Sequence, residues 1–211
     1  HRDLHSFPTR RSSDLALSKA GPKMLPENPD VEGLGIYGTA GVVMPQQSMG
    51  TLPTYNYNEG QFEGAEEISG ERMAETVLKE RDTCYACVVR CKRVVEITEG
   101  KYQVDPLYGG AEYETIATFG SYCGVNDLAA ISKANQICNM YAVDTISCGA
   151  TIAFAMECYE KGIITKEQTG GLDLRFGDAD IMLEVIQQIV ENKGSLGKLL
   201  SQGSANAAKV W

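Results

Sequence analysis

Apolar residues recur with the helical period through the second half of the chain. Over residues 126–140 they fall on one face, and Asn126 or Asp127 stands where a helix-capping residue is expected. A second periodic run over residues 149–161 stops at Gly162, a residue type that commonly ends helices. The pattern therefore predicts two successive helices in this region.

Further helices are indicated toward the end of the chain. Asp178 is expected to cap an amphipathic helix over residues 181–192, and shorter helices are expected at 196–200 and from Ser204 onward. Thr165 begins a Thr-Lys-Glu-Gln stretch that matches a capping box. The second half of the chain should therefore be largely helical.

The preceding part of the chain mixes two patterns. An apolar stripe predicts a helix over residues 68–81, with Ser69 able to cap its start. Residues 94–97 and 102–104 alternate around Gly100, which is typical of a β-hairpin. The fold class we expect is mainly α: a helical domain with a small β-hairpin near the cysteine cluster, truncated at both ends.

Composition divides the chain into three segments. Residues 1–14 have no apolar period and resemble translated sequencing-adapter sequence, so they are left out of the fold prediction. Residues 15–65 are rich in Gly, Pro, Asn and Thr and should be loop-rich, whereas residues 66–211 should form an incomplete helical domain. Both histidines, His1 and His5, lie in the first segment, so chemistry elsewhere must use carboxylates, thiols, Tyr, Lys or a cofactor.

A glycine-rich stretch over residues 33–41 has enough glycines to approach a phosphate. No clear strand precedes it and no clear helix follows it, and both would be needed for a dinucleotide-binding loop. A phosphate-binding role is therefore only weakly indicated.

Bulk properties exclude several functions. The net charge is −9, which disfavours nucleic acid as the main partner because phosphate binding needs a basic face. No run approaches the ~20 apolar residues of a membrane span. The cysteine count is seven, and this odd number, with no secretory signal, argues against a disulfide framework. We therefore expect a cytoplasmic protein.

The most informative stretch carries three thiols. Cys84, Cys87 and Cys91 have the spacing C-x2-C-x3-C, which can bring three sulfurs to one point. Iron–sulfur clusters and zinc both prefer thiolate, and either site usually needs four protein ligands. Alternatively, the three positions share one face of a helix and hold buried core thiols. We favour metal or cluster ligation, because three cysteines this close together are dense for chance.

Positive side chains flank these thiols. Arg90, Lys92 and Arg93 would raise the reduction potential of a cluster beside them, because a nearby cation favours the more negative state. Alternatively, they are solvated surface charges.

Two carboxylates, Glu112 and Glu114, follow a flexible Gly-Gly pair. In an extended loop they would point the same way, which suits metal or acid–base chemistry. The simpler alternative is an exposed acidic loop.

Several motifs together resemble the tungsten-containing aldehyde ferredoxin oxidoreductase family. The resemblance covers nearly all of the chain after residue 15, although each motif alone would be weak. Besides the cysteine cluster, the motifs are G-x-L-P-T-x-N at 50–56, G-x-E-Y-E-T at 110–115, F-G-S-x-C-G at 119–124, A-N-x-x-C-N at 134–139 and D-T-I-S-x-G at 144–149.

The resemblance implies two cofactors. The three clustered cysteines would hold a 4Fe–4S cluster, whose fourth cysteine lies in a later domain of the family. The family's pterin-binding pattern, D-x-x-G-L-C/D, reads Asn139 to Asp144 here, with Asn for the first Asp and Ala for Gly. Asn139, Asp144 and the adjoining Thr145 would contact a tungsten, or molybdenum, bis-pyranopterin.

The implied reaction is oxidation of a small aldehyde to a carboxylic acid, with ferredoxin as electron acceptor. Glu112 or Glu114 would move protons or position water. The resemblance also implies missing amino- and carboxy-terminal domains, and it allows a homodimer.

Two other functions are kept as alternatives. One is the tungsten subunit of an aromatic-ring reductase complex, in which the same cluster site serves reduction. The other is a non-catalytic iron–sulfur or zinc-binding module. Metal content would separate these functions.

Overall fold

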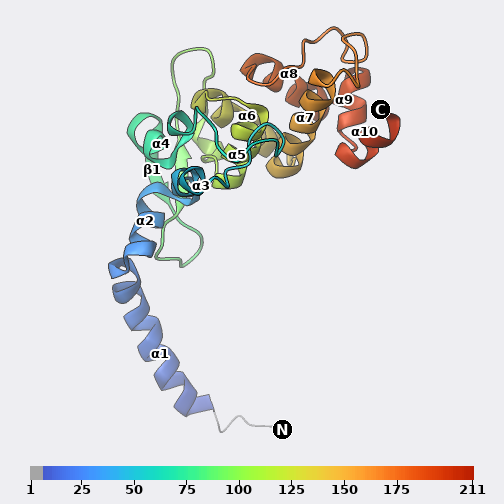
Figure 1. Ribbon diagram of the computed structural model, residues 1–211. Helices are drawn as coiled ribbons and strands as arrows, with labels where there is room; N and C mark the ends of the chain where they lie inside the picture. Colours follow the sequence, from blue (N-terminus) through green and yellow to red (C-terminus); the bar gives the residue numbers. More distant parts are fainter. Residues whose placement is uncertain (1–6) are drawn as a thin grey trace, which may run out of the picture.

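Helices build most of the described chain, which confirms the mainly α fold class. Figure 1 shows the computed structural model, which describes residues 7–211 and their side chains from residue 14 onward. The α-helices are α1 (Phe7–Met24), α2 (Pro29–Tyr37), α3 (Val43–Met49), α4 (Gly70–Thr76), α5 (Tyr113–Phe119), α6 (Leu128–Tyr141), α7 (Thr145–Glu160), α8 (Ala179–Val190), α9 (Gly194–Leu200) and α10 (Ser204–Val210). The other elements are strands β1 (Leu78–Asp82) and β2 (Lys92–Val95) and the 3₁₀ turns η1 (Leu25–Glu27), η2 (Thr39–Val42), η3 (Glu66–Ile68), η4 (Pro106–Tyr108) and η5 (Ser121–Cys123).

The amino-terminal region contains more helix than its composition suggested. The expectation that residues 15–65 are loop-rich is wrong where the end of α1, α2 and α3 lie in this segment. Asn28 starts α2 by accepting a hydrogen bond from the Asp30 amide (3.0 Å), and Pro29 occupies the first helical position, where its missing N–H costs nothing. Residues 1–6 lie outside the described part, and α1 extends away from the rest (Figure 1). The three-segment division stays a prediction.

The sheet is a hairpin that frames the cysteines. β1 and β2 pair antiparallel, with Leu78 opposite Val95 and Asp82 opposite Lys92. The helix expected over residues 68–81 begins as predicted, with Ser69 accepting from the Arg72 amide (3.1 Å), but it ends at Thr76 because the following residues pair with β2 instead.

The hairpin expected around Gly100 is reduced to a single bridge. Ile97 and Val104 exchange two backbone hydrogen bonds of 3.1 and 2.9 Å, and no further pairs form beside them. The expected β-hairpin near the cysteines therefore exists, but β1 takes the place of residues 102–104 as the partner strand.

The carboxy-terminal helices follow the predicted pattern closely. The Asp127 and Asp178 side chains cap α6 and α8, as expected. α7 begins four residues earlier than predicted, at Thr145, because Asp144 serves as its cap. The stretch after Thr165 forms turns rather than a helix, with the Gln168 side chain accepting from the Thr165 amide (2.8 Å).

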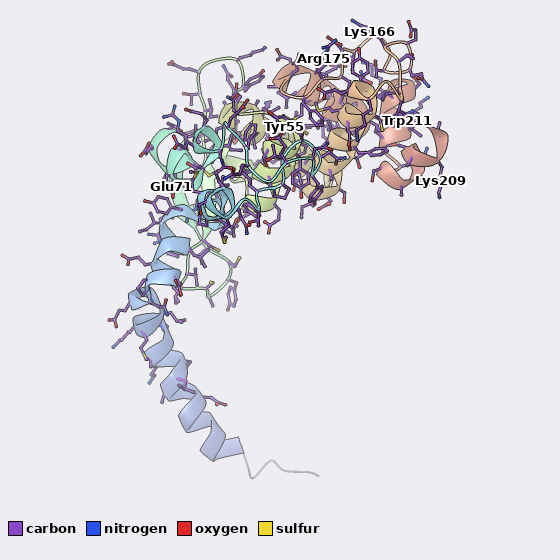
Figure 2. All side chains as sticks on the ribbon, viewed as in Figure 1. Tyr55, Glu71, Lys166, Arg175, Lys209 and Trp211 are labelled. Atoms are coloured by element: carbon purple, nitrogen blue, oxygen red, sulfur yellow. The ribbon has the colours of Figure 1, made fainter. Side chains whose placement is uncertain are left out.

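The core centres on α5 and α7. The last five residues of α5 are buried, and α7 crosses it at Gly149, which faces Thr118. In Figure 1, α5 and α6 lie in the middle, β1 and α4 at one side, and α7 to α10 at the other. Figure 2 places Trp211 at this second side, where its ring stacks on Phe154 with centroids 5.9 Å apart. Among the described helices, none has the length and apolar character to cross a bilayer.

The α5–α7 crossing gives a first prediction. A Cβ at Gly149 would lie 2.6 Å from the Thr118 Cβ and 2.8 Å from its carbonyl carbon. Gly149→Ala should therefore lower the free energy of unfolding by about 1–3 kcal/mol, as overpacking does, measured by urea unfolding. Gly33→Ala, in α2 with open space around it, is the control and should not destabilise. Equal stability of the two variants would contradict the close crossing.

Candidate functional site

The three clustered cysteines lie on the loop between β1 and β2. Cys84 is exposed, whereas Cys87 and Cys91 are half-buried. Ala86 and Arg90 adopt left-handed φ values of 55° and 57°, which no helix contains. The alternative of one helical face of buried thiols is therefore wrong.

Short hydrogen bonds give this cysteine loop, residues 83–91, a defined start. The Thr83 amide donates to the Asp82 carboxylate (2.7 Å), and its hydroxyl donates to the Cys87 carbonyl (2.5 Å) with the Cys84 carbonyl at 3.1 Å. The Cys87 amide donates back to the Cys84 carbonyl at 3.1 Å. The first two thiols are thus held on one tight turn.

The remaining cysteines are buried and unsuited to ligation. Cys123, Cys138, Cys148 and Cys158 are all core residues. Burial raises the pKa of the Cys123 and Cys158 thiols, and a hydrogen bond with Cys138 together with burial raises the pKa of Cys148. A raised thiol pKa disfavours the thiolate that metals bind. The cysteine loop therefore carries the only thiols of the described chain that lie outside the core.

The donor types fit a metal or cluster, but the described side chains do not gather at one point. Across residues 14–211, no three or more His, Cys, Asp or Glu side chains are close enough together to hold a metal ion. The convergence expected from the cysteine spacing is therefore absent from this structure. The three thiols lie outside the core and share one short loop. Their chemical type therefore suits a cluster, although their sulfurs are not gathered around one point in this structure.

Beside this loop lies a cavity of about 480 Å³ between β2, η4 and the facing ends of α6 and α7. Three of the predicted site residues, Glu112, Asn139 and Thr145, line it together. Glu114 and Asp144 do not. Residues far apart in the sequence thus meet at one polar cavity.

Glu112 stands at the amino-terminal end of α5, where it is half-buried. The Thr39 hydroxyl donates to its carboxylate and accepts from the Tyr113 amide at 2.9 Å. Thr39 therefore fixes the carboxylate on the cavity wall. Sequence reasoning missed this contact, because the partners are 73 positions apart and no local pattern links them.

Glu114 lies one position inside α5 and is exposed. Successive helical residues are rotated by about 100°, so positions two apart diverge by about 200°. The expectation that Glu112 and Glu114 point the same way is therefore wrong, since it assumed an extended loop.

The predicted pterin-binding residues form the α6–α7 corner. The Asn139 amide group donates to the Tyr108 carbonyl at 3.1 Å, and the Thr145 and Thr115 hydroxyls lie 2.8 Å apart. Ala142 ends α6 with a left-handed φ of 55°. Glycine adopts that conformation without cost, which gives a physical reason for a glycine at this position of the pattern.

Asp144 caps α7 from this corner. Its carboxylate accepts from the Ser147 amide at 2.7 Å, and hydrogen bonds from the side chain and the amide of Ser147 lower the pKa of Asp144. Its side chain is exposed and stands outside the cavity lining. The residue therefore has a clear structural role, while its contact with a pterin stays a prediction.

Arg93 is the residue whose importance the sequence did not reveal. It is only 3% exposed, and its guanidinium donates to four carbonyls: those of Gly35 (3.0 Å), Ile36 (2.5 Å), Arg90 (2.7 Å) and Cys91 (3.2 Å). The alternative of a solvated charge is wrong for Arg93. Burial lowers its pKa, and the guanidinium stays charged at neutral pH.

The other two cations stay at the surface. Lys92 is exposed and pairs with Asp82 at 3.2 Å, and the Arg90 side chain donates to the Arg81 carbonyl at 3.0 Å. The sequence alone does not separate Arg93 from its exposed neighbours, because burial here depends on α2 lying against the loop.

Comparison with known proteins gives a consistent result. A family model described as "Aldehyde ferredoxin oxidoreductase, domains 2 & 3" matches residues 16–211. The chain is 39% identical over 183 residues to a tungsten-containing aldehyde ferredoxin oxidoreductase of Thermococcus kodakarensis, and 38% identical over 181 residues to that of Pyrococcus furiosus. It is 30% identical over 157 residues to the WOR-like subunit of an aliphatic sulfonate oxidoreductase of P. furiosus.

The alignments cover most of this chain but a minor part of each relative. For T. kodakarensis the shares are 85% of this chain and 29% of the relative, and for the sulfonate oxidoreductase subunit they are 74% and 24%. The active-site complex BamBC of benzoyl coenzyme A reductase, solved with 1,5-dienoyl-CoA, shares the fold with a TM-score of 0.58 at 19% identity, over 79% of this chain and 24% of that one. The chain thus spans less than a third of the relatives it matches.

The Asp144 cap gives a second prediction. Asp144→Ala should lower the free energy of unfolding at pH 7 by about 1 kcal/mol, whereas Asp144→Asn should cost only a few tenths, because Asn caps helices as well as Asp. The pKa of Asp144 is lowered in the folded state, so its charge stabilises the fold above the unfolded-state pKa of about 3.9 and ceases to do so as the pH falls through the folded value.

Urea unfolding of the two variants and the original chain between pH 7 and 3 tests this. The stability gap between the original chain and Asp144→Ala should shrink on acidification, while the gap between the two variants should stay constant. If the difference in free energy of unfolding between the original chain and Asp144→Ala did not change with pH, the charge of Asp144 would not contribute to the cap.

Proposed function

The chain belongs to the aldehyde ferredoxin oxidoreductase family, and we propose that the protein oxidises aldehydes to carboxylic acids with ferredoxin as electron acceptor. The observation that carries the proposal is the single cavity lined by Glu112, Asn139 and Thr145 directly beside the cysteine loop. Identity near 39% to enzymes named for this activity supports it. The proposal includes function in the cytoplasm and allows a homodimer.

Cys84, Cys87 and Cys91 would hold three corners of a 4Fe–4S cluster. Their position on a loop outside the core supports this role, because the loop can bring its sulfurs together on binding without unpacking the core. Metal binding often orders its own site, because the free energy of forming the metal–ligand bonds exceeds the free-energy cost of ordering the loop. The buried cysteines are poor fourth ligands, so the fourth ligand comes from outside residues 14–211.

Asn139, Asp144 and Thr145 would hold a tungsten, or molybdenum, bis-pyranopterin at the α6–α7 corner. The cavity beside them offers amide, hydroxyl and carboxylate groups, which suit a polar heterocycle. When bound, the tungstopterin would accept the two electrons released from the aldehyde, and the cluster would pass them singly to ferredoxin. Tungsten is named for the relatives, which supports the same cofactor here.

Glu112 would hold and move protons during the reaction. Oxidation of an aldehyde with water to a carboxylic acid releases two electrons and two protons, so a base near the reacting carbon is required. Glu112 lines the cavity, and the Thr39 hydroxyl fixes one of its oxygens, leaving the other for water or substrate. Glu114, which is exposed and outside the cavity lining, is the less suited of the two.

The alternatives differ in metal content and direction of reaction. The fold shared with the benzoyl coenzyme A reductase complex keeps reduction of an aromatic ring as a second proposal, which would require no aldehyde turnover. A zinc or iron module without catalysis would contain no tungsten. Metal analysis of the complete parent protein and an aldehyde assay with ferredoxin decide among the three.

The cluster proposal makes a third prediction. In the complete parent protein, replacing Cys84, Cys87 or Cys91 by Ser should each remove most of the about four iron atoms that one cluster contains. Cys158→Ala, a buried thiol on α7, is the matched control and should keep its iron. Iron and acid-labile sulfide are measured together; zinc in their place, or full iron in all three Ser variants, would refute the cluster.

The role of Glu112 makes a fourth prediction. Glu112→Gln should lower kcat for aldehyde oxidation by about 10²–10⁴-fold, the usual contribution of a general acid or base. Glu114→Gln, two positions away and exposed, should change kcat by less than about threefold. Both variants should retain tungsten and iron. A larger loss for Glu114→Gln would transfer the role to Glu114.

A further inference from the structure

The glycine-rich stretch ends against the cysteine loop rather than in a phosphate site. Gly35 and Gly38 stand at the carboxy-terminal end of α2, and both are buried. A Cβ at Gly35 would lie 2.6 Å from an Arg81 guanidinium nitrogen and 3.1 Å from the Val89 carbonyl oxygen. The missing side chain therefore lets α2 and the loop touch backbone to backbone.

Gly38 makes the closer contact. A Cβ there would lie 2.7 Å from the Cys91 carbonyl oxygen and 3.1 Å from the Arg93 Nε. Its φ of +65° also disfavours any residue with a side chain. Two features therefore favour glycine at position 38: its left-handed φ and the close approach of the Cys91 carbonyl.

Arg93 joins the same two segments. Its planar guanidinium donates to Gly35 and Ile36 on α2 and to Arg90 and Cys91 on the loop. The guanidinium group has five N–H donors in one plane, so it can donate to several carbonyls at fixed angles. A lysine ammonium group cannot form the same set of hydrogen bonds. Loss of the guanidinium group would leave these buried carbonyls without hydrogen-bond donors.

We propose that Arg93 and Gly38 are positioning residues that set the place of Cys91 for cluster binding, and that the glycine stretch is the cradle of the cysteine loop. The inference rests on the proposed function only in naming the cluster. Cys84 and Cys87 are held by their own turn around Thr83, so Cys91 is the one thiol whose place depends on α2.

The first test measures the thiols of the full chain after a chelator has removed any metal. Rates of iodoacetamide alkylation are followed for each cysteine by mass spectrometry. Arg93→Lys and Gly38→Ala both preserve the charge near Cys91, so a changed rate reports access rather than thiol pKa. In Arg93→Lys, Cys91 should react about tenfold faster, because one hydrogen bond to a charged group contributes roughly a decade in a local opening equilibrium. In Gly38→Ala it should also react faster, because the added methyl group displaces the Cys91 carbonyl.

Three internal comparisons make the result decisive. Cys84, already exposed, should react at an unchanged rate, and Gly33→Ala, in the same helix with open space around it, should leave Cys91 unchanged. An unchanged Cys91 rate in both Arg93→Lys and Gly38→Ala would overturn the proposal. So would parallel exposure of the buried Cys123, because the two residues would then support the whole fold and not this loop.

A second readout separates this proposal from the proposed function. In the complete parent protein, Arg93→Lys and Gly38→Ala should lower iron and sulfide content, while Gly33→Ala should not. If the original protein contains no iron but the alkylation rates change as expected, the cluster proposal is refuted and the positioning role of Arg93 and Gly38 is supported. If the original protein and both variants keep their full iron and sulfide content and Cys91 reacts at an unchanged rate, the positioning role is refuted and the cluster proposal is supported.

Discussion

The buried guanidinium of Arg93 holds together the parts of the molecule that matter for its chemistry. A charge that is only 3% exposed would be costly without partners, and four backbone carbonyls from α2 and the cysteine loop supply them. The same residue belongs to β2 and lines the polar cavity. One side chain therefore contacts the end of α2, the Cys91 backbone and the cavity wall.

The turn that follows α2 extends this connection to the candidate carboxylate. Gly38 lies against the Cys91 backbone, and its neighbour Thr39 donates to Glu112 and accepts from the first amide of α5. Two adjacent residues thus contact the proposed cluster loop and the proposed proton-transfer group. A shift of this turn would move both together, so the proposed cluster loop and the proposed proton-transfer group share one structural support.

Local signals predicted the helices, and contacts between distant residues decided the rest. Asp127, Asp178 and Ser69 cap their helices as the sequence indicated, because a cap is a contact between residues two or three positions apart. β1 was missed because its helical pattern gave way to pairing with β2, whose residues lie ten or more positions further along the chain. In the site, the cysteine loop and the Asn139–Thr145 corner followed from motifs, whereas the burial of Arg93 and the Thr39–Glu112 bond depend on how α2 packs.

The α6–α7 corner shows how a ligand-binding pattern can also be a structural one. Its fourth position, Ala142, takes a left-handed φ of 55°, which costs an alanine about 1 kcal/mol relative to glycine. Its last position, Asp144, caps α7 through the Ser147 amide. The cap depends on Asp144, which is kept, whereas the turn is formed here with Ala142 in the place of the pattern's glycine. The corner therefore presents Asn139 and Thr145 to the cavity, and the replacement of Asp by Asn removes a negative charge from the proposed pterin contact.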